Sequence, residues 1–329
     1  MNVTLIGIDL AKSIFQVCAV NQQGKTVFNR QVRRNRLMAL LLDHPGAVVA
    51  MEACGGSNYW GRELEQRGYT VKLIPPQHVK PFVKGNKNDR NDAFAITEAA
   101  RRPHLRCVQP RSLEQTDLIQ VHRVLDRRVR ERTSLINQIR GFLSEYGVVV
   151  SRGKERLWQA LPGLLEESDN GLTPSARGLV CELQREWAEL DRAIAYLEKR
   201  IKTQSRCDEG AQRLMQIKGV GERIATAAVA FAGNGQGYHN GRHFSANLGL
   251  VPQEHSSGGK QRMGGMSKRG NRYLRRLLIQ GAWSVVRYAE RGQDRLSRWA
   301  VKLVERRGKH KAAIAVANKM ARIIWSMLY

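Results

Sequence analysis

The order of strand and helix signals in the first hundred residues limits the fold more than any other feature of the chain. Three β-rich runs open the sequence, at residues 3–9, 14–20 and 24–32. Short turns separate them, so they predict an antiparallel meander. Helix and strand signals then alternate, at residues 36–44, 47–52, 58–68 and 70–74. After the break at Pro75-Pro76, a last helix is expected from Asn88 to about Arg101.

Four carboxylates stand at the ends of these elements. Asp9 ends the first predicted strand, Glu52 ends the fourth, and Asp89 and Asp92 lie three residues apart on one face of the last helix. Acids at a helix start are often no more than capping and first-turn residues. The element order, however, is that of a ribonuclease-H/resolvase-like α/β domain, which many polynucleotidyl transferases use. A set of ligands made only of carboxylate oxygens favours Mg²⁺ or Mn²⁺. We therefore predict one metal site formed by these four acids.

Two long helices are expected after this domain, at residues 113–150 and around residues 183–201, with mixed structure over residues 151–180. In the second helix the apolar positions step alternately by four and three: Leu183, Trp187, Leu190, Ile194, Leu197 and Ile201. Such a seam predicts a coiled coil, formed within one chain or between chains. We therefore expect three parts: residues 1–105, a coiled-coil connector over residues 106–207, and a mostly α-helical domain over residues 208–329.

The charge of the chain predicts a polyanionic partner. The 55 basic and 29 acidic residues give a formal net charge of +26. A surplus of this size opposes compaction unless a polyanion neutralises it, and nucleic acid is the usual one. No run of about 18 apolar residues suggests a membrane span, and the N-terminal stretch lacks the features of a signal peptide. A cytoplasmic protein with reduced cysteines is expected, and its six scattered tryptophans suggest no base-stacking platform.

Half of the net charge lies in residues 260–311, where 16 Lys or Arg stand against 3 Asp or Glu. This stretch begins in a glycine-rich loop, "SSGGKQRMGGMSKRG", which is too polar to form a core. The loop predicts a phosphate-binding segment or one that orders on nucleic acid. Its candidate nucleic-acid contacts are Lys260, Arg262, Lys268, Arg269 and Arg272.

A second candidate for phosphate binding lies at residues 217–221, "IKGVG", which has the order of a helix-hairpin-helix turn. In such a turn the backbone amides at Gly219 and Gly221 could bind a phosphate, and Lys218 and Arg223 would flank it. An ordinary helical hairpin in the core fits the same pattern equally well.

Five stretches together carry a family resemblance: "IGIDLAK", "MEACGGSNYW", "NKNDRNDA", "GVG" and "GLVPQEHSSGGKQRMGGMSKRGNRYLRRLLIQGA". In this order, over essentially the whole chain, they resemble the DEDD-class insertion-sequence transposases related to pilin-gene invertases. These transposases are also known as bridge-RNA or seek-RNA recombinases.

The resemblance implies roles for particular residues. The metal-site acids of the family match Asp9, Glu52, Asp89 and Asp92, and its catalytic serine matches Ser257, with Ser256 in reserve. It implies a phosphoserine intermediate, donor and target DNA, and a non-coding guide RNA. It also implies a homotetramer, built as a dimer of dimers and associated with the nucleoid. Each active site would combine the acids of one protomer with the serine of another.

Two other functions fit part of the same pattern. A metal-only junction endonuclease would use the four acids and water, with the serines merely contacting phosphate. A nucleic-acid-binding protein with a decayed site would use the basic surface alone, but the four intact acids make this the weaker alternative.

Overall fold

In the computed structural model, which describes residues 2–86 and 88–329, the chain divides into two compact units. The sheet unit comprises Met1–Leu113 with Asn234–His239, and the helical unit comprises Glu114–Gly233 with Asn240–Tyr329. Most of the expected connector thus belongs to the helical unit, and the division into three parts remains a prediction. No helix of the described residues is long and apolar enough to cross a membrane.

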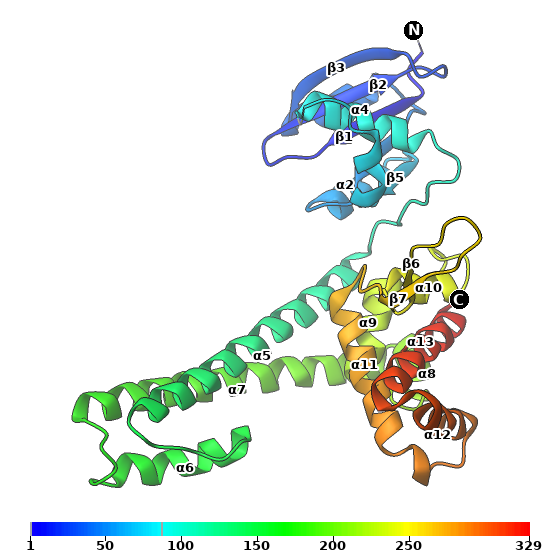
Figure 1. Cartoon of the computed structure of the whole chain (residues 1–329). Helices are drawn as coiled ribbons and strands as arrows, with labels where there is room; N and C mark the ends of the chain where they lie inside the picture. Colours follow the sequence, from blue (N-terminus) through cyan, green and yellow to red (C-terminus); the bar gives the residue numbers. More distant parts are fainter. Residues whose placement is uncertain (1, 87) are drawn as a thin grey trace. The chain divides into compact units, whose positions relative to one another are not determined.

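The sheet unit contains a five-stranded mixed sheet (Figure 1). Its strand order is β3-β2-β1-β4-β5. Its strands are β1 (Leu5–Asp9), β2 (Ile14–Val20), β3 (Thr26–Arg33), β4 (Val48–Glu52) and β5 (Val71–Ile74). The first three strands pair antiparallel, β4 is parallel to β1, and β5 is parallel to β4. The predicted meander and the two later strands are therefore confirmed.

Helices cover both faces of this sheet because successive residues of a strand point to opposite sides. Ile8, Val17 and Met51 belong to one core together with residues of α1 (Leu37–Leu42) and α2 (Ser57–Glu65). The other core contains Cys18, Val20 and Ala50 with residues of α4 (Asp89–Ala100). Short turns of helix complete the unit, at α3 (Pro76–Val79), η1 (Arg34–Arg36) and η2 (Lys80–Phe82).

The helical unit contains two long helices, α5 (Leu113–Glu145) and α7 (Pro174–Cys207), which pack antiparallel. Leu125 shares a core cluster with Ile201, whereas Leu143 of α5 shares another with Val180 of α7. The seam of α7 is therefore buried against α5 of the same chain.

Residues 151–180 are more helical than the sequence suggested. They contain α6 (Lys154–Glu166), which has Pro162 in its interior and buries Leu157 and Leu161 beside α5 and α7. Helix α7 starts earlier than its heptad seam because Thr173 caps it, accepting a hydrogen bond from Ala176 N at 3.1 Å.

The rest of the helical unit is a group of shorter helices with one small hairpin. Its elements are α8 (Glu209–Met215), α9 (Glu222–Ala232), α10 (Gly241–Asn247), β6 (Pro252–Glu254), β7 (Met263–Met266), α11 (Arg272–Arg287), η3 (Ala289–Arg291), α12 (Arg295–Arg307) and α13 (Lys309–Leu328). Helix α13 packs against α10, α11 and α12.

A buried histidine joins α5 to this group. His122 is fully buried, with its Nδ1 3.0 Å from the Tyr273 hydroxyl and its Nε2 3.1 Å from Thr226 Oγ1. The Thr226 hydroxyl donates to Glu222 O at 2.7 Å. Nε2 must therefore carry the proton that Thr226 Oγ1 accepts, and Nδ1 accepts from Tyr273. Burial, and secondarily the nearby Arg223, lowers the pKa of His122 to about 4.

This network predicts a pH-dependent free energy of unfolding. The unfolded chain takes up a proton at His122 near pH 6.5, whereas the folded chain does so only near pH 4. Stability from neutral His122 is therefore present above pH 6.5 and lost as the pH falls to about 4, by up to about 3 kcal/mol. The free energy of unfolding in urea should be higher for the wild type than for His122→Gln at neutral pH, and this difference should become smaller as the pH falls from 6.5 to 4. An equal fall of the free energy of unfolding with pH in both proteins would contradict the network.

Candidate active site

Two of the four predicted acids are neighbours at the ends of parallel strands. Ile8 of β1 lies opposite Met51 of β4, so Asp9 and Glu52 follow as the next pair in register, on strands about 4.8 Å apart. Both side chains are half-buried. By strand alternation both lie on the face that α4 covers, the face of Leu5 and Ala50.

The pKa of the Cys54 thiol is affected by the negative charges of both acids. Burial raises the pKa of Cys54, and the negative charges of Glu52 and Asp9 raise it further. The Cys54 backbone amide donates to Glu52 O at 2.8 Å, in the turn that follows β4. The two carboxylates thus act on one point at the carboxyl end of the sheet.

The orientation of α4 brings the other two acids to the same end. Arg101, after the last turn of α4, donates from Nη2 to Gln23 O at 2.9 Å. Gln23 lies in the turn after β2, at the end of the sheet where β1 begins, since Val20 pairs with Leu5. The first turn of α4, with Asp89 and Asp92, therefore lies toward the end where β1 and β4 finish.

A glycine lets α4 lie directly on β1. A Cβ atom on Gly7 would lie 2.8 Å from Ala93 O and 2.6 Å from Thr97 Cγ2. Asp89 is one helical turn before Ala93 and thus on the same side of the helix. Asn88 fixes the start of that turn by accepting a hydrogen bond from Asn91 N at 2.9 Å, as the sequence predicted.

The donor types at this end fit a hard divalent cation, because all four are carboxylates. The geometry is incomplete, however: among residues 2–86 and 88–329, no three His, Cys, Asp or Glu side chains form a group that could hold a metal ion. Asp92 is half-buried beside the helix–sheet contact, and Asp89 is exposed. The fold supplies Asp9 and Glu52 as a pair, and the acids of α4 stand at the same end of the sheet.

The predicted serines lie in the hairpin formed by β6 and β7. Ser257 and Lys260 exchange backbone hydrogen bonds of 3.3 and 3.0 Å around Gly258 and Gly259. Both glycines have positive φ, 55° and 74°, as a type I′ turn requires.

The two serine hydroxyls differ in their hydrogen bonds. Ser256 Oγ donates to Glu254 Oε1 at 2.7 Å and accepts from Arg262 N at 3.2 Å. The exposed Ser257 hydroxyl makes no hydrogen bond within the part of the chain that the structure describes. Ser256 therefore stabilises the hairpin, and Ser257 presents its hydroxyl at the turn.

The base of the hairpin is held by Arg275, a residue that the sequence did not single out. Its Nη1 donates to Leu248 O at 2.9 Å and to Arg269 O at 2.6 Å, and its side chain is 8% exposed. Arg275 was hidden among the many basic residues of this region. Only burial distinguishes it from the surface cations.

The predicted nucleic-acid contacts fall into two groups. Those in and after the hairpin are exposed and have no ion-pair partner among the described residues: Lys260, Arg262, Lys268, Arg269 and Arg272. Lys218, by contrast, donates to Asp294 Oδ2 at 2.8 Å and to Ser297 Oγ at 2.7 Å. These bonds hold the pKa of Asp294 below its usual range. Arg223 is paired with Glu198.

The predicted helix-hairpin-helix turn is packed inside the helical unit. Gly219 has φ of 84°, and a Cβ there would lie 2.8 Å from Gly281 O of α11. Gly221 is the N-cap residue of α9. The glycines of this turn therefore have a packing role, and phosphate binding by its amides stays a prediction.

Comparison with known proteins identifies the family. A family model described as "Transposase" matches residues 6–148, and one described as "Transposase IS116/IS110/IS902 family" matches residues 211–297. The chain is 43% identical to the transposase for insertion sequence element IS1111A of Coxiella burnetii, over 99% of this chain and 90% of that protein. This chain belongs to the IS110 family of insertion-sequence transposases.

Other relatives agree with this assignment. The transposase is 45% identical to a probable family 20 transposase of Pseudomonas aeruginosa, over 100% of this chain and 97% of that protein. It is 24% identical to the pilin gene-inverting protein of Moraxella lacunata, over 100% of this chain and 96% of that protein. The family predicted from the motifs is thus confirmed as an insertion-sequence transposase family with distant pilin-gene invertase relatives.

The contact at Gly7 gives a testable prediction for the transposase. Gly7→Ala places a methyl group against Ala93 O and Thr97, so it should lower the free energy of unfolding by about 1–3 kcal/mol. Gly55→Ala is the control in the same unit, because a Cβ there meets nothing within 4 Å. Calorimetry should show a lower transition temperature for Gly7→Ala only. Equal stability of both variants would contradict the close packing of α4 on β1.

Proposed function

We propose that this transposase cuts and rejoins DNA strands with Ser257 as the nucleophile and Asp9, Glu52, Asp89 and Asp92 as metal ligands. The observation that carries the proposal is the difference between the two serines. Ser256 is tied to Glu254 and Arg262, whereas Ser257 stands at a tight turn with a hydroxyl that has no partner among the described residues.

The sheet supports the assignment of the acids. An order of β3-β2-β1-β4-β5, with the first three strands antiparallel, is the arrangement expected of a ribonuclease-H/resolvase-like domain. Asp9 and Glu52 lie at the carboxyl ends of neighbouring parallel strands, where α/β folds usually place their sites. We assign the sheet unit to that fold on this basis.

The reaction that we propose is an exchange of phosphate esters. Ser257 Oγ forms a bond to the phosphorus of the scissile phosphodiester, the bond to the leaving sugar oxygen breaks, and the serine proton ends on that oxygen. The phosphoserine link conserves the bond energy. Attack by the hydroxyl of a second strand end therefore breaks the bond from phosphorus to Ser257 Oγ and rejoins DNA without an external energy source such as ATP. Lys260 and Arg262 would hold the phosphate charge. Mg²⁺ or Mn²⁺ at the four acids would stabilise the attacking and leaving oxygens.

The partners in the proposal are donor DNA, target DNA and a non-coding guide RNA. The net charge of +26 supports binding to several strands at once. Base pairing with the RNA would read the sequence, and cations would bind its backbone by charge and shape. We propose a homotetramer, a dimer of dimers, in which the acids and the serine of one active site come from different protomers. The acids and Ser257 belong to different compact units, which is compatible with such a composite site.

Covalent trapping tests the proposal. The full-length protein, Mg²⁺, the RNA from the element's flank and labelled DNA carrying the element's end would be run on a denaturing gel. We expect a protein–DNA adduct with wild type and Ser256→Ala. Ser257→Ala should lose the adduct and lower strand cleavage by about 10³-fold or more, as loss of a nucleophile does. Asp9→Asn should lose both the adduct and strand cleavage.

Other outcomes would change the mechanism. Cleavage by Ser257→Ala without any adduct would identify a metal-only endonuclease. An adduct lost in Ser256→Ala and kept in Ser257→Ala would move the nucleophile by one residue. Omission of the RNA tests guidance separately, because unchanged cleavage of the correct site without RNA would contradict it.

A further inference from the structure

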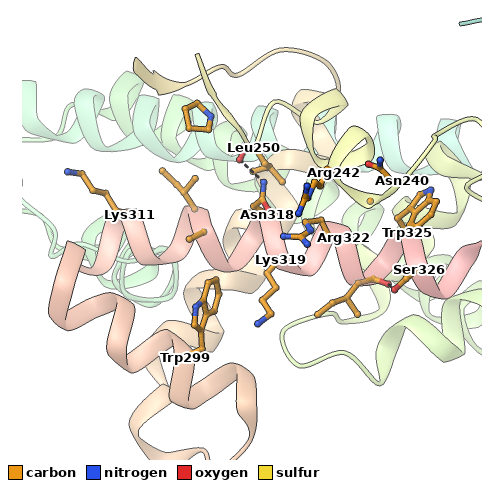
Figure 2. A pocket seen from close by; sticks show the side chains of 15 residues that line it. Asn240, Arg242, Leu250, Trp299, Lys311, Asn318, Lys319, Arg322, Trp325 and Ser326 are labelled. Carbon is orange, nitrogen blue, oxygen red and sulfur yellow. Dashed lines mark hydrogen bonds between the residues drawn. The ribbon is translucent and has the colours of Figure 1, made fainter. Parts of the chain in front are cut away.

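A groove of about 980 Å³ lies along α13 in the helical unit (Figure 2). One side is formed by the start of α10 and the segment around Leu250 and Pro252, and Trp299 of α12 contributes to the other. None of the residues assigned to catalysis or to nucleic-acid contact above lines this groove. The volume is in the upper range of pockets for small organic ligands, roughly 300–1,000 Å³.

The groove is positively charged. Its cations are Arg242, Lys311, Lys319 and Arg322, and its lining contains no Asp or Glu among the described residues. None of the four cations has an ion-pair partner within the part of the chain that the structure describes. Helix α13 itself contains no acidic residue. Such a groove attracts an anionic ligand, because nothing within it neutralises the charge.

Two tryptophans that are distant in sequence lie in this groove. Trp299 comes from α12 and Trp325 from α13, and both are half-buried. Lys319 Nζ lies 4.5 Å from the centroid of the Trp299 ring. The Trp325 ring stacks on Tyr329, with centroids 5.0 Å apart and an angle of 19°, and Tyr329 is 74% exposed. Aromatic rings and cations thus occur together in the groove, and Figure 2 shows Lys319 beside Trp299.

The floor of the groove is fixed by the fold. Asn318 Nδ2 donates to Leu250 O at 3.1 Å and to Ser245 Oγ at 3.3 Å. A Cβ on Gly241 would lie 3.0 Å from Arg322 O, so α10 approaches the backbone of α13 directly. The groove is therefore formed before any ligand binds, which lowers the ordering cost of binding.

We propose that this groove binds an unpaired segment of DNA strand. The four cations would contact successive phosphates, and Trp299, Trp325 and Tyr329 would stack with bases. Stacking needs an exposed base face, which a paired duplex offers only at its ends. The family assignment implies DNA substrates, and exchange of strands between two duplexes leaves bases unpaired while each strand changes its partner. The proposal needs the family assignment only, and not Ser257 or the metal.

A second copy of the chain is a less suitable occupant. In a two-fold contact the same patch meets itself, so the four cations of one copy would face the same four of the other. Like charges across an interface are unfavourable, and no acid in the lining could offset them. Charge complementarity therefore favours a polyanion.

Binding of a short fluorescein-labelled oligothymidylate to the full-length protein tests the proposal by fluorescence anisotropy, without metal. We expect Trp325→Leu to weaken binding by about 5–150-fold, the range for losing one stacked base. Arg322→Ala should weaken binding and reduce the slope of log Kd against log salt by about one unit. Trp158→Leu and Arg298→Ala are the matched controls. They lie outside the groove, are exposed on α6 and α12, and should bind as the wild type does.

Several results would overturn the proposal. One is an unchanged affinity for the oligothymidylate in both groove variants. Another is an equal loss of affinity for blunt duplex DNA in these variants, or tighter binding of an RNA of matched sequence by the wild type. The last is a change in oligomeric state of Trp325→Leu in sedimentation. Thermal melting confirms that each variant is folded. The assay contains no metal and follows binding rather than strand cleavage, so failure of the serine mechanism leaves this test intact.

Discussion

The seating of α4 on β1 is the contact on which the candidate active site depends. Four acids from three separate elements can serve one site only if the helix lies close to the sheet and runs in the right direction. The missing side chain at Gly7 allows the close approach. The hydrogen bond from Arg101 to Gln23 shows which way the helix runs. Together these two contacts put the acids of α4 toward the end of the sheet that carries Asp9 and Glu52.

A second constraint is that the basic side chains fall into two sets, those held in ion pairs and those without an acidic partner among the described residues. Arg223, Arg276 and Lys218 are each held by a carboxylate, and they join parts of the helical unit. The cations of the β6–β7 hairpin and of the α13 groove have no such partner among the described residues. The chain therefore combines structural ion pairs with two exposed cationic surfaces that no carboxylate among the described residues neutralises.

The sequence predicted the strands and helices of the sheet unit well, because each is short, bounded by turn residues and clearly periodic. It also placed Asp9, Glu52, Asp89 and Asp92 at the ends of the correct elements. It missed α6, because Pro162 and the nearby glycines are residues that usually end a helix. In the structure α6 continues through Pro162. The difference between Ser256 and Ser257 depends on the hydrogen bonds of Ser256 with Glu254 and, across the hairpin, with the backbone of Arg262, and the sequence alone did not show either. Trp299 and Trp325 share a groove through tertiary packing alone.

The turn at Gly258 and Gly259 also determines what the hairpin can enter. A two-stranded β-ribbon fits the major groove of B-DNA, which is about 12 Å wide. Two glycines at the tip add no side chains to the width of the ribbon, so main chain alone lies between the side chains of Ser257 and Lys260. The tip of the hairpin is therefore narrow, and a bulkier pair of residues at these two positions would widen the part of the ribbon that enters such a groove first.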